Sequence, residues 1–388
     1  MFVVICGCGI AGLALAQRLD RLGCQVLLVE KAMGPREEGF MMDFFGPGYD
    51  AAEAMGLRER IHELGYLISA VSYRDDRGRQ RATLRYDTLA RALHGRLVSI
   101  MRPDLEQALR ETVTGRVEVR YGTSIAAVHQ EPDVVRCALT DGTTVAADLL
   151  VGADGIHSVV RKFTFGPDSE FLRFLGYHTA AYTFTDDALA GVLGDQFCLT
   201  DSVHRQLGMY RLRDGRVATF AAHRAPHLEL PADPPAALRR QYATLGWVVP
   251  RALDSCPPAH RLYYDQVAQV VMPGWHRGRV VLLGDAACAV SLLAGQGASM
   301  AIAGAYVLAR SITDGQPLAD GLRRYEAAVR PLAEQRQRAG RDAARWFVPA
   351  SARQRAVRRT ALRLARLPLV DRMIIRSVAG KPSHIIAG

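Results

Sequence analysis

The sequence predicts an α/β protein in which a parallel sheet with flanking helices is joined to an antiparallel sheet and a C-terminal helical segment. The first 31 residues, MFVVICGCGIAGLALAQRLDRLGCQVLLVEK, have a strand–helix–strand pattern. Later segments such as YHTAAYTFT and GMYRLRDGRVATFAAH alternate between the two faces of a strand, which favours antiparallel pairing. At 388 residues, 49% of them hydrophobic, the chain is long enough for two or more lobes.

Composition excludes several classes of protein. No apolar run approaches the roughly 20 residues of a membrane-spanning helix, so we expect no integral membrane association and a cytoplasmic location. The seven cysteines are scattered and lack C-x-x-C pairs, which predicts free thiols and no metal site. Residues 341–388 hold ten Arg and one Lys against two Asp, a net charge of +9 out of +10. This local concentration, without interleaved aromatic residues, predicts no nucleic-acid partner.

Three glycines with G-x-G-x-x-G spacing, Gly7, Gly9 and Gly12, join the first strand to the first helix. In this motif the first glycine allows a tight turn, the second lets the backbone approach a pyrophosphate, and the third lets helix and strand pack closely. The anion then lies at the helix N-terminus, beside Ile10 and Ala11. Glu30 ends the second strand, where it can accept hydrogen bonds from a ribose, and Lys31 follows it. The motif predicts a dinucleotide without choosing between NAD and FAD.

A later stretch, GRVVLLGDAACAVSLLAGQGAS, indicates which dinucleotide is bound. Its strand ends in Gly284-Asp285, and its helix begins at a loop made of Gly295, Gln296, Gly297 and Ala298. A carboxylate at the end of a buried strand suits a polyol chain, and the N–H groups of the loop suit an electron-poor ring. FAD has both parts, whereas NAD has no ribityl chain. The alternative is that Asp285 only caps the following helix.

A third motif lies in AADLLVGADGIHSVVRK, where an apolar strand ends in Asp154-Gly155. With these motifs in this order, the sequence resembles the group A flavoprotein monooxygenases, the aromatic-hydroxylase family that includes tetracycline-inactivating monooxygenases. The resemblance places Arg36 and Arg102 beside the flavin or its phosphates. It implies a Rossmann-like, glutathione-reductase-type FAD-binding domain built from 1–70, 100–165 and 270–335. Residues 71–99 and 166–269 would form a substrate-binding antiparallel sheet, and 336–388 a C-terminal helical tail.

The resemblance also implies the reaction. No second G-x-G-x-x-G is present, so NAD(P)H would dock transiently, reduce FAD and leave. Dioxygen would then add at flavin C4a, and the resulting hydroperoxide would hydroxylate an aromatic or polycyclic small molecule. Because the flavin carries the chemistry, no catalytic side chain is nominated. An FAD-dependent reductase and a redox-silent binding protein of the same fold remain alternatives, and the protein is expected to be a monomer or homodimer.

Three positions depart from the family pattern. Cys288 stands where His or a large residue is common, Leu292 where Pro is common, and Ser299 where Asn is frequent. These departures bear on the geometry of oxygen activation.

Substrate contacts are expected from an aromatic-rich segment and from the antiparallel sheet. The candidates are Met42, Phe44, Tyr177, Tyr182, Tyr210 and His223. An apolar, aromatic-lined pocket would favour a planar aromatic compound. For each residue, ordinary packing is the alternative.

The basic tail predicts a helix with Ser351 as its N-cap. Its arginines lie opposite an apolar stripe of Ala352, Ala356, Leu364 and Leu367. We expect this stripe to pack against the protein while Arg355, Arg358, Arg359, Arg363 and Arg366 face solvent. Recruitment of an acidic partner or a membrane is the alternative.

Overall fold

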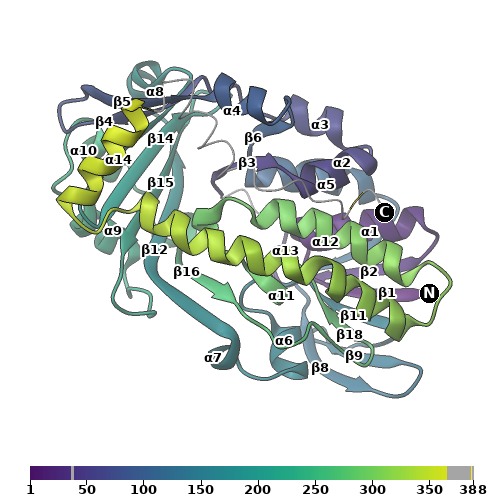
Figure 1. Ribbon diagram of the computed structural model, residues 1–388. Coiled ribbons are helices and arrows are strands. Elements are labelled where there is room, and N and C mark those ends of the chain that lie inside the picture. The colour runs from purple at the N-terminus through teal and green to yellow at the C-terminus, as the bar shows by residue number, and fades with distance from the viewer. Residues whose placement is uncertain (36–38, 365–385, 387–388) are drawn as a thin grey trace.

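A computed structural model describes residues 1–35, 39–364 and 386 (Figure 1). Arg36, Arg366 and Leu367, named above, lie outside these residues. A six-stranded sheet contains the strands of the first motif. Neighbouring strands in it are parallel, except for one antiparallel pair at the edge, which β17 (His276–Arg277) forms with β18 (Val280–Leu282). Its order is β17, β18, β11 (Leu149–Gly152), β1 (Phe2–Cys6), β2 (Gln25–Glu30) and β7 (Glu118–Tyr121). The four apolar inner strands are buried on both faces, as parallel strands between helices require.

Helices cover this sheet and bring distant segments together. Helix α1 packs against both α12 and α5, and α13 packs along α12. The elements of this part are α1 (Ile10–Arg21), α2 (Pro47–Ala54), α3 (Arg58–Glu63), α5 (Arg102–Val113), α6 (Val159–Thr164), α11 (Asp285–Cys288), η2 (Leu292–Ala294), α12 (Gly297–Ile312) and α13 (Leu318–Phe347). Two small antiparallel units complete it: β3 (Met41–Phe45) with β6 (Leu97–Met101), and β8 (Ile125–Gln130), β9 (Val135–Leu139) and β10 (Thr144–Ala147).

A seven-stranded sheet forms the second part, and only the pair β4–β13 is parallel. Its order is β16 (Tyr263–Val270), β12 (Leu172–Phe184), β15 (Val217–Arg224), β14 (Arg205–Arg211), β13 (Gln196–Ser202), β4 (Ala70–Arg74) and β5 (Gln80–Arg85). The helices around it are α4 (Tyr86–Ala92), α7 (Asp168–Phe171), α8 (Asp187–Leu193), α9 (Pro234–Tyr242), α10 (Val249–Asp254) and η1 (Ala259–Arg261). Residues of α8, α9 and α10 bury one face of the sheet in a separate core.

The edge strand β16 connects the two parts. It pairs with β12 at both ends, with a register shift between them, and its last residue, Val270, also donates its N–H to the carbonyl of Ala289 in the loop after α11. Two buried glutamines tie this junction to α13. Gln337 Nε2 donates to the carbonyls of Val270 and Ala289 at 2.7 and 3.1 Å, and Gln269 Nε2 donates to that of Val290 at 3.0 Å. The first half of β16 therefore lies over the carboxyl edge of the parallel sheet.

The C-terminal helix α14 (Ala352–Leu364) corrects one expectation. Ser351 does accept a hydrogen bond from the N–H of Gln354 at 3.2 Å, as an N-cap should. Ala352 and Ala356, however, are exposed, while Arg358 is only 1% exposed. The arginine face, not the alanine face, packs against the protein.

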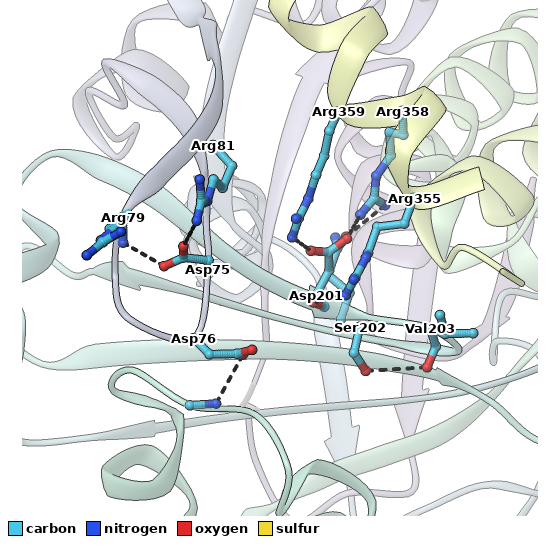
Figure 2. Close-up of polar contacts among 12 residues, drawn as sticks. Asp75, Asp76, Arg79, Arg81, Asp201, Ser202, Val203, Arg355, Arg358 and Arg359 are labelled. Carbon is cyan, nitrogen blue, oxygen red and sulfur yellow. Dashed lines mark hydrogen bonds and ion pairs between the residues drawn. The ribbon is translucent and has the colours of Figure 1, made fainter. Parts of the chain in front are cut away.

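The reason is a buried carboxylate on β13. Asp201 is 3% exposed and forms ion pairs with Arg358 and, at 2.6 Å, with Arg359 (Figure 2). The Arg358 guanidinium also lies over the ring of Tyr73, 4.9 Å from its centroid. The carboxylate of Asp201 and the ring of Tyr73 therefore compensate the positive charge of Arg358, which the sequence pattern of the helix had predicted to face solvent.

All seven cysteines are free, as predicted. Among the described residues, no group of His, Cys, Asp or Glu could hold a metal ion, and no helix is long and apolar enough to cross a membrane.

Candidate active site

Two adjoining cavities lie at the carboxyl edge of the parallel sheet. One is about 770 Å³ and the other about 1010 Å³, mouths included. They share Gly9, Arg102, Ala153 and Gly155, so together they form one elongated trough. Most predicted cofactor-binding residues line it: Gly7, Glu30, Lys31 and Asp154 in the first cavity, Ile10, Ala11, Asp285, Gly295, Gly297 and Ala298 in the second, and Gly9, Arg102 and Gly155 in both. Gly12, Gly284 and Gln296 lie behind the walls.

The glycines of the first motif differ in what constrains them. Gly7 has a φ of +107°, and a Cβ there would lie 2.4 Å from the carbonyl oxygen of Ala153. A Cβ on Gly12 would lie 1.9 Å from the carbonyl oxygen of Gly7, so the crossing of β1 and α1 requires Gly12, whereas the turn and the neighbouring chain after β11 require Gly7. A Cβ on Gly9 would meet no atom of the described residues closer than 3.4 Å. Protein packing therefore leaves Gly9 unexplained, whereas a ligand pressed against the backbone explains it.

Charged groups near this turn are held in place. Glu30 accepts hydrogen bonds from the N–H groups of Cys8 and Ala32, each at 2.9 Å. Arg102, at the start of α5, pairs with Glu106 at 2.7 Å and lines both cavities. A carboxylate and a guanidinium thus lie on either side of the uncapped N-terminus of α1, an arrangement that suits a ribose and a phosphate.

The two aspartates of the later motifs behave differently. Asp154 accepts hydrogen bonds from the Ser158 hydroxyl and the N–H of Val159, at 2.5 and 2.7 Å, so its carboxylate caps α6. Within the described part of the chain the Asp285 side chain makes no capping hydrogen bond to a helix, which argues against the alternative considered for it, and it is open to the second cavity. Desolvation by the surrounding walls raises the pKa of Asp285, and the charge of Arg102 partly offsets this. Asp285 is thus an acceptor facing the trough.

The loop before α12 closes the far end of the trough. Gly295 adopts a left-handed conformation with φ of +64°, and no side chain caps the N-terminus of the 16-residue helix α12. Gln296 is buried, and neither of its side-chain polar atoms has a hydrogen-bond partner within the described residues. The uncapped helix gives this end of the trough positive potential and free N–H donors.

These features fit FAD along its whole length. Open space above Gly9, an acceptor at Asp285 and a second uncapped helix at α12 match a pyrophosphate, a polyol and an electron-poor ring in that order. The ring would lie in the second cavity.

The wall opposite the loop is aromatic and includes residues that were not predicted. Phe40 packs against Phe220 and Tyr263 with ring centroids 5.7 Å apart in both pairs. Phe40, Tyr263, Asp265 and Gln266 line the second cavity, as does the predicted Met42. Phe40 comes from a loop beside the aromatic-rich segment, and the other three come from β16, where their signal was the run YYDQ on the strand that precedes Gly284-Asp285.

The other predicted substrate contacts lie away from this cavity. Phe44 packs against Tyr49 in the main core, and Tyr177 packs in a core formed with α13. The other three face distinct partners: Tyr182 donates to the carbonyl of Ala252, Tyr210 accepts from the N–H of Met41, and His223 contacts the hydroxyls of Tyr242 and Tyr264. The physical reason is that both faces of the large sheet are covered, so aromatic residues on either face have packing partners.

The departures from the family pattern have local explanations at two of the three positions. Ser299 donates to the carbonyl of Phe45 and accepts from the N–H of Gly48, at 2.8 and 2.9 Å, which ties α12 to the turn before α2. Cys288 is buried with its thiol 3.6 Å from the carbonyl of Gly284. Leu292 lines the second cavity, and nothing in the structure explains the replacement of proline there.

A trough of this shape at the carboxyl edge of a parallel sheet, roofed by an antiparallel sheet, defines a flavoprotein of the two-domain hydroxylase type. Comparison with known sequences agrees: the FAD binding domain family matches residues 1–170 and 261–339. The chain belongs to this family and, within it, to the group A flavoprotein monooxygenases. It is an FAD-dependent monooxygenase.

Individual relatives are similar over most of the chain. An uncharacterized protein of Mycobacterium tuberculosis, Rv1260, is 33% identical over 346 residues, covering 86% of this chain and 91% of that protein. A flavin-dependent monooxygenase from an unknown prokaryotic organism is 29% identical, covering 87% and 88%. Among solved structures, the tetracycline destructase Tet(55) has a TM-score of 0.82 and 26% identity, covering 97% of this chain and 96% of that one.

Proposed function

We propose that the enzyme uses NAD(P)H and dioxygen to hydroxylate an aromatic or polycyclic small molecule. The observation that carries this proposal is the single trough that runs from Gly9 to an aromatic wall formed by Phe40 and Tyr263. Flat apolar walls with few polar groups suit a planar ring system. A relative whose name specifies tetracycline supports a polycyclic substrate.

When bound, FAD would supply the redox chemistry that links NAD(P)H to dioxygen. The chain's own work is binding and shielding. Asp285 holds the polyol, the N–H groups at the start of α12 stabilise negative charge on the ring, and Arg102 balances the phosphates. The aromatic wall orients the substrate ring and keeps water away from it.

The test is a screen of aromatic compounds for acceleration of NADH and NADPH oxidation by the purified, FAD-loaded enzyme. Hits are then converted under ¹⁸O₂ and weighed by mass spectrometry. Incorporation of one labelled oxygen atom into the product supports the proposal. A product that gains only hydrogen, formed equally well without air, makes the enzyme a reductase instead.

A further inference from the structure

Five carboxylates of the described residues line the trough, and one of them has no role in the site as described above. Four of its carboxylates already have roles, as backbone acceptor, ion-pair partner, helix cap and open acceptor beside the flavin loop: Glu30, Glu106, Asp154 and Asp285. Asp265, on β16, is the fifth. Within the described ranges it forms no ion pair, and its only hydrogen bond is the one that Oδ1 accepts from the N–H of Gln266 at 2.8 Å.

The position of Asp265 places this carboxylate beside the aromatic wall. Tyr263 is two residues earlier on the same strand, so the two side chains lie on the same face of β16. Tyr263 in turn packs against Phe40, and all three residues line the second cavity. A substrate ring lying against Phe40 and Tyr263 would therefore bring its substituents near Asp265.

A half-buried carboxylate without a counter-ion is costly, because its charge loses hydration without gaining a partner. Desolvation raises the pKa of Asp265, while the N–H of Gln266 and the more distant His157 and His178 lower it. A ligand that donates a hydrogen bond would remove this cost. An apolar ligand or one with an anionic group facing β16 would increase it.

We propose that Asp265 selects substrates that carry a hydrogen-bond donor, a phenolic or enolic hydroxyl or an amino N–H, on the ring that lies against Phe40 and Tyr263. This assignment rests on the proposed function and narrows its substrate class. The same donors push electron density into the ring, and a carboxylate that accepts their proton in a hydrogen bond strengthens that effect. The selected compounds are thus those whose ring carbons are most readily hydroxylated.

The test uses binding rather than turnover, with two probes that differ by methylation of one hydroxyl, which removes the donor. 7-Hydroxycoumarin and 7-methoxycoumarin are titrated into oxidised, FAD-loaded protein without nicotinamide, under conditions in which the phenol keeps its proton. Coumarin fluorescence and flavin absorbance report binding. The native protein should prefer the hydroxyl probe, and Asp265→Ala should reduce that preference about tenfold, the usual size of a hydrogen bond to a charged group.

Asp265→Asn, which keeps the shape and a neutral acceptor, should lie between the two, and Glu229→Gln, at an exposed carboxylate elsewhere, should match the native protein. FAD content of every variant is measured on the same preparation. FAD-loaded native protein without a preference for the hydroxyl probe, or an alanine variant that weakens both probes equally, overturns the role of Asp265 alone. Native protein that binds no FAD overturns the proposed function and this role with it.

Discussion

Replacing Arg358 with methionine should release helix α14 from the antiparallel sheet. Arg358 is 1% exposed, and its guanidinium contacts the Asp201 carboxylate, the Gln206 side-chain oxygen at 3.0 Å and the face of Tyr73. Removing one member of a buried ion pair costs about 3–5 kcal/mol, because the remaining charge is left uncompensated. Arg359 still pairs with Asp201 in the variant, so we expect about 3 kcal/mol, which is about a 100-fold increase in the open population of the helix.

Limited trypsin digestion measures this opening, since α14 carries several arginines that are cleaved only when the helix detaches. Arg353→Met is the matched control, because Arg353 lies on the same helix but is exposed. Adding Asp201→Asn to Arg358→Met should recover part of the loss by removing a buried charge that Arg359 alone compensates only in part. Equal cleavage rates for native protein, Arg358→Met and the control would refute the assignment of a buried arginine face.

Three further predictions follow from the site and its supports. Asp285→Ala should weaken FAD binding about tenfold or more, because hydroxyls of the ribityl chain lose their acceptor, at a cost on the order of 1–3 kcal/mol. Fluorescence titration of the apoprotein with FAD measures the affinity, and Asp285→Asn should have a smaller effect. An unchanged affinity in the alanine variant contradicts the role of Asp285. Gln337→Leu leaves two buried carbonyls at the β16 junction without this donor and should lower the free energy of unfolding by about 1–3 kcal/mol. Urea titration measures this as a lower midpoint, and an unchanged midpoint would mean that the junction does not depend on this glutamine. Burial lowers the pKa of His223 to about 4, so the unfolded state binds a proton at a higher pH than the folded state does. The free energy of unfolding should therefore fall by about 3 kcal/mol between pH 6.5 and pH 4. Urea titrations should show a shallower fall for His223→Gln, and an equally steep fall would mean that His223 is not the titrating group.

The flavin motifs were predictable because each lies within a short stretch of chain. Gly12 is required by the crossing of one strand and one helix within the same 31-residue unit, and Gly7 by the positive φ of its turn, whereas the close approach of Ala153 to Gly7 depends on the whole fold. Asp285 follows its strand directly, so its place at the carboxyl edge needs no knowledge of the rest of the fold. The atoms that each acidic side chain contacts were not predictable. Asp154 is an example, because its carboxylate accepts a hydrogen bond from the N–H of Val159 at the start of α6.

The orientation of α14 could not be predicted from its own sequence. A helical wheel with arginines on one side and alanines on the other favours a solvated arginine face. The opposite arrangement depends on Asp201, which lies 157 residues before Arg358 and is buried on a neighbouring sheet. A buried charged residue on one strand can thus decide which face of a distant helix packs inward. The sequence of the helix alone does not contain this information, because only the tertiary structure brings the two residues together.

The substrate-facing residues were hidden for a related reason. In a sheet with one covered face, alternation identifies the inward side chains, but the large sheet is covered on both faces and its aromatic residues pack on either. Tyr182 and Tyr210 follow the same aromatic pattern as a pocket residue would, yet each hydroxyl is used in a core.

What distinguishes the first half of β16 is its connection. Its last residues still pair with β12, and they also bond to the loop after α11 and to α13 through the buried Gln269 and Gln337. We therefore expect a shift of that loop to move Asp285 on one side and β16 on the other, so that one junction would set both flavin position and substrate position. The coupling explains why substrate selectivity should respond to changes at Gln337 that contact neither ligand, and a change in FAD affinity should accompany it. A Gln337 variant that alters probe selectivity while leaving FAD binding untouched would separate the two and contradict a shared junction.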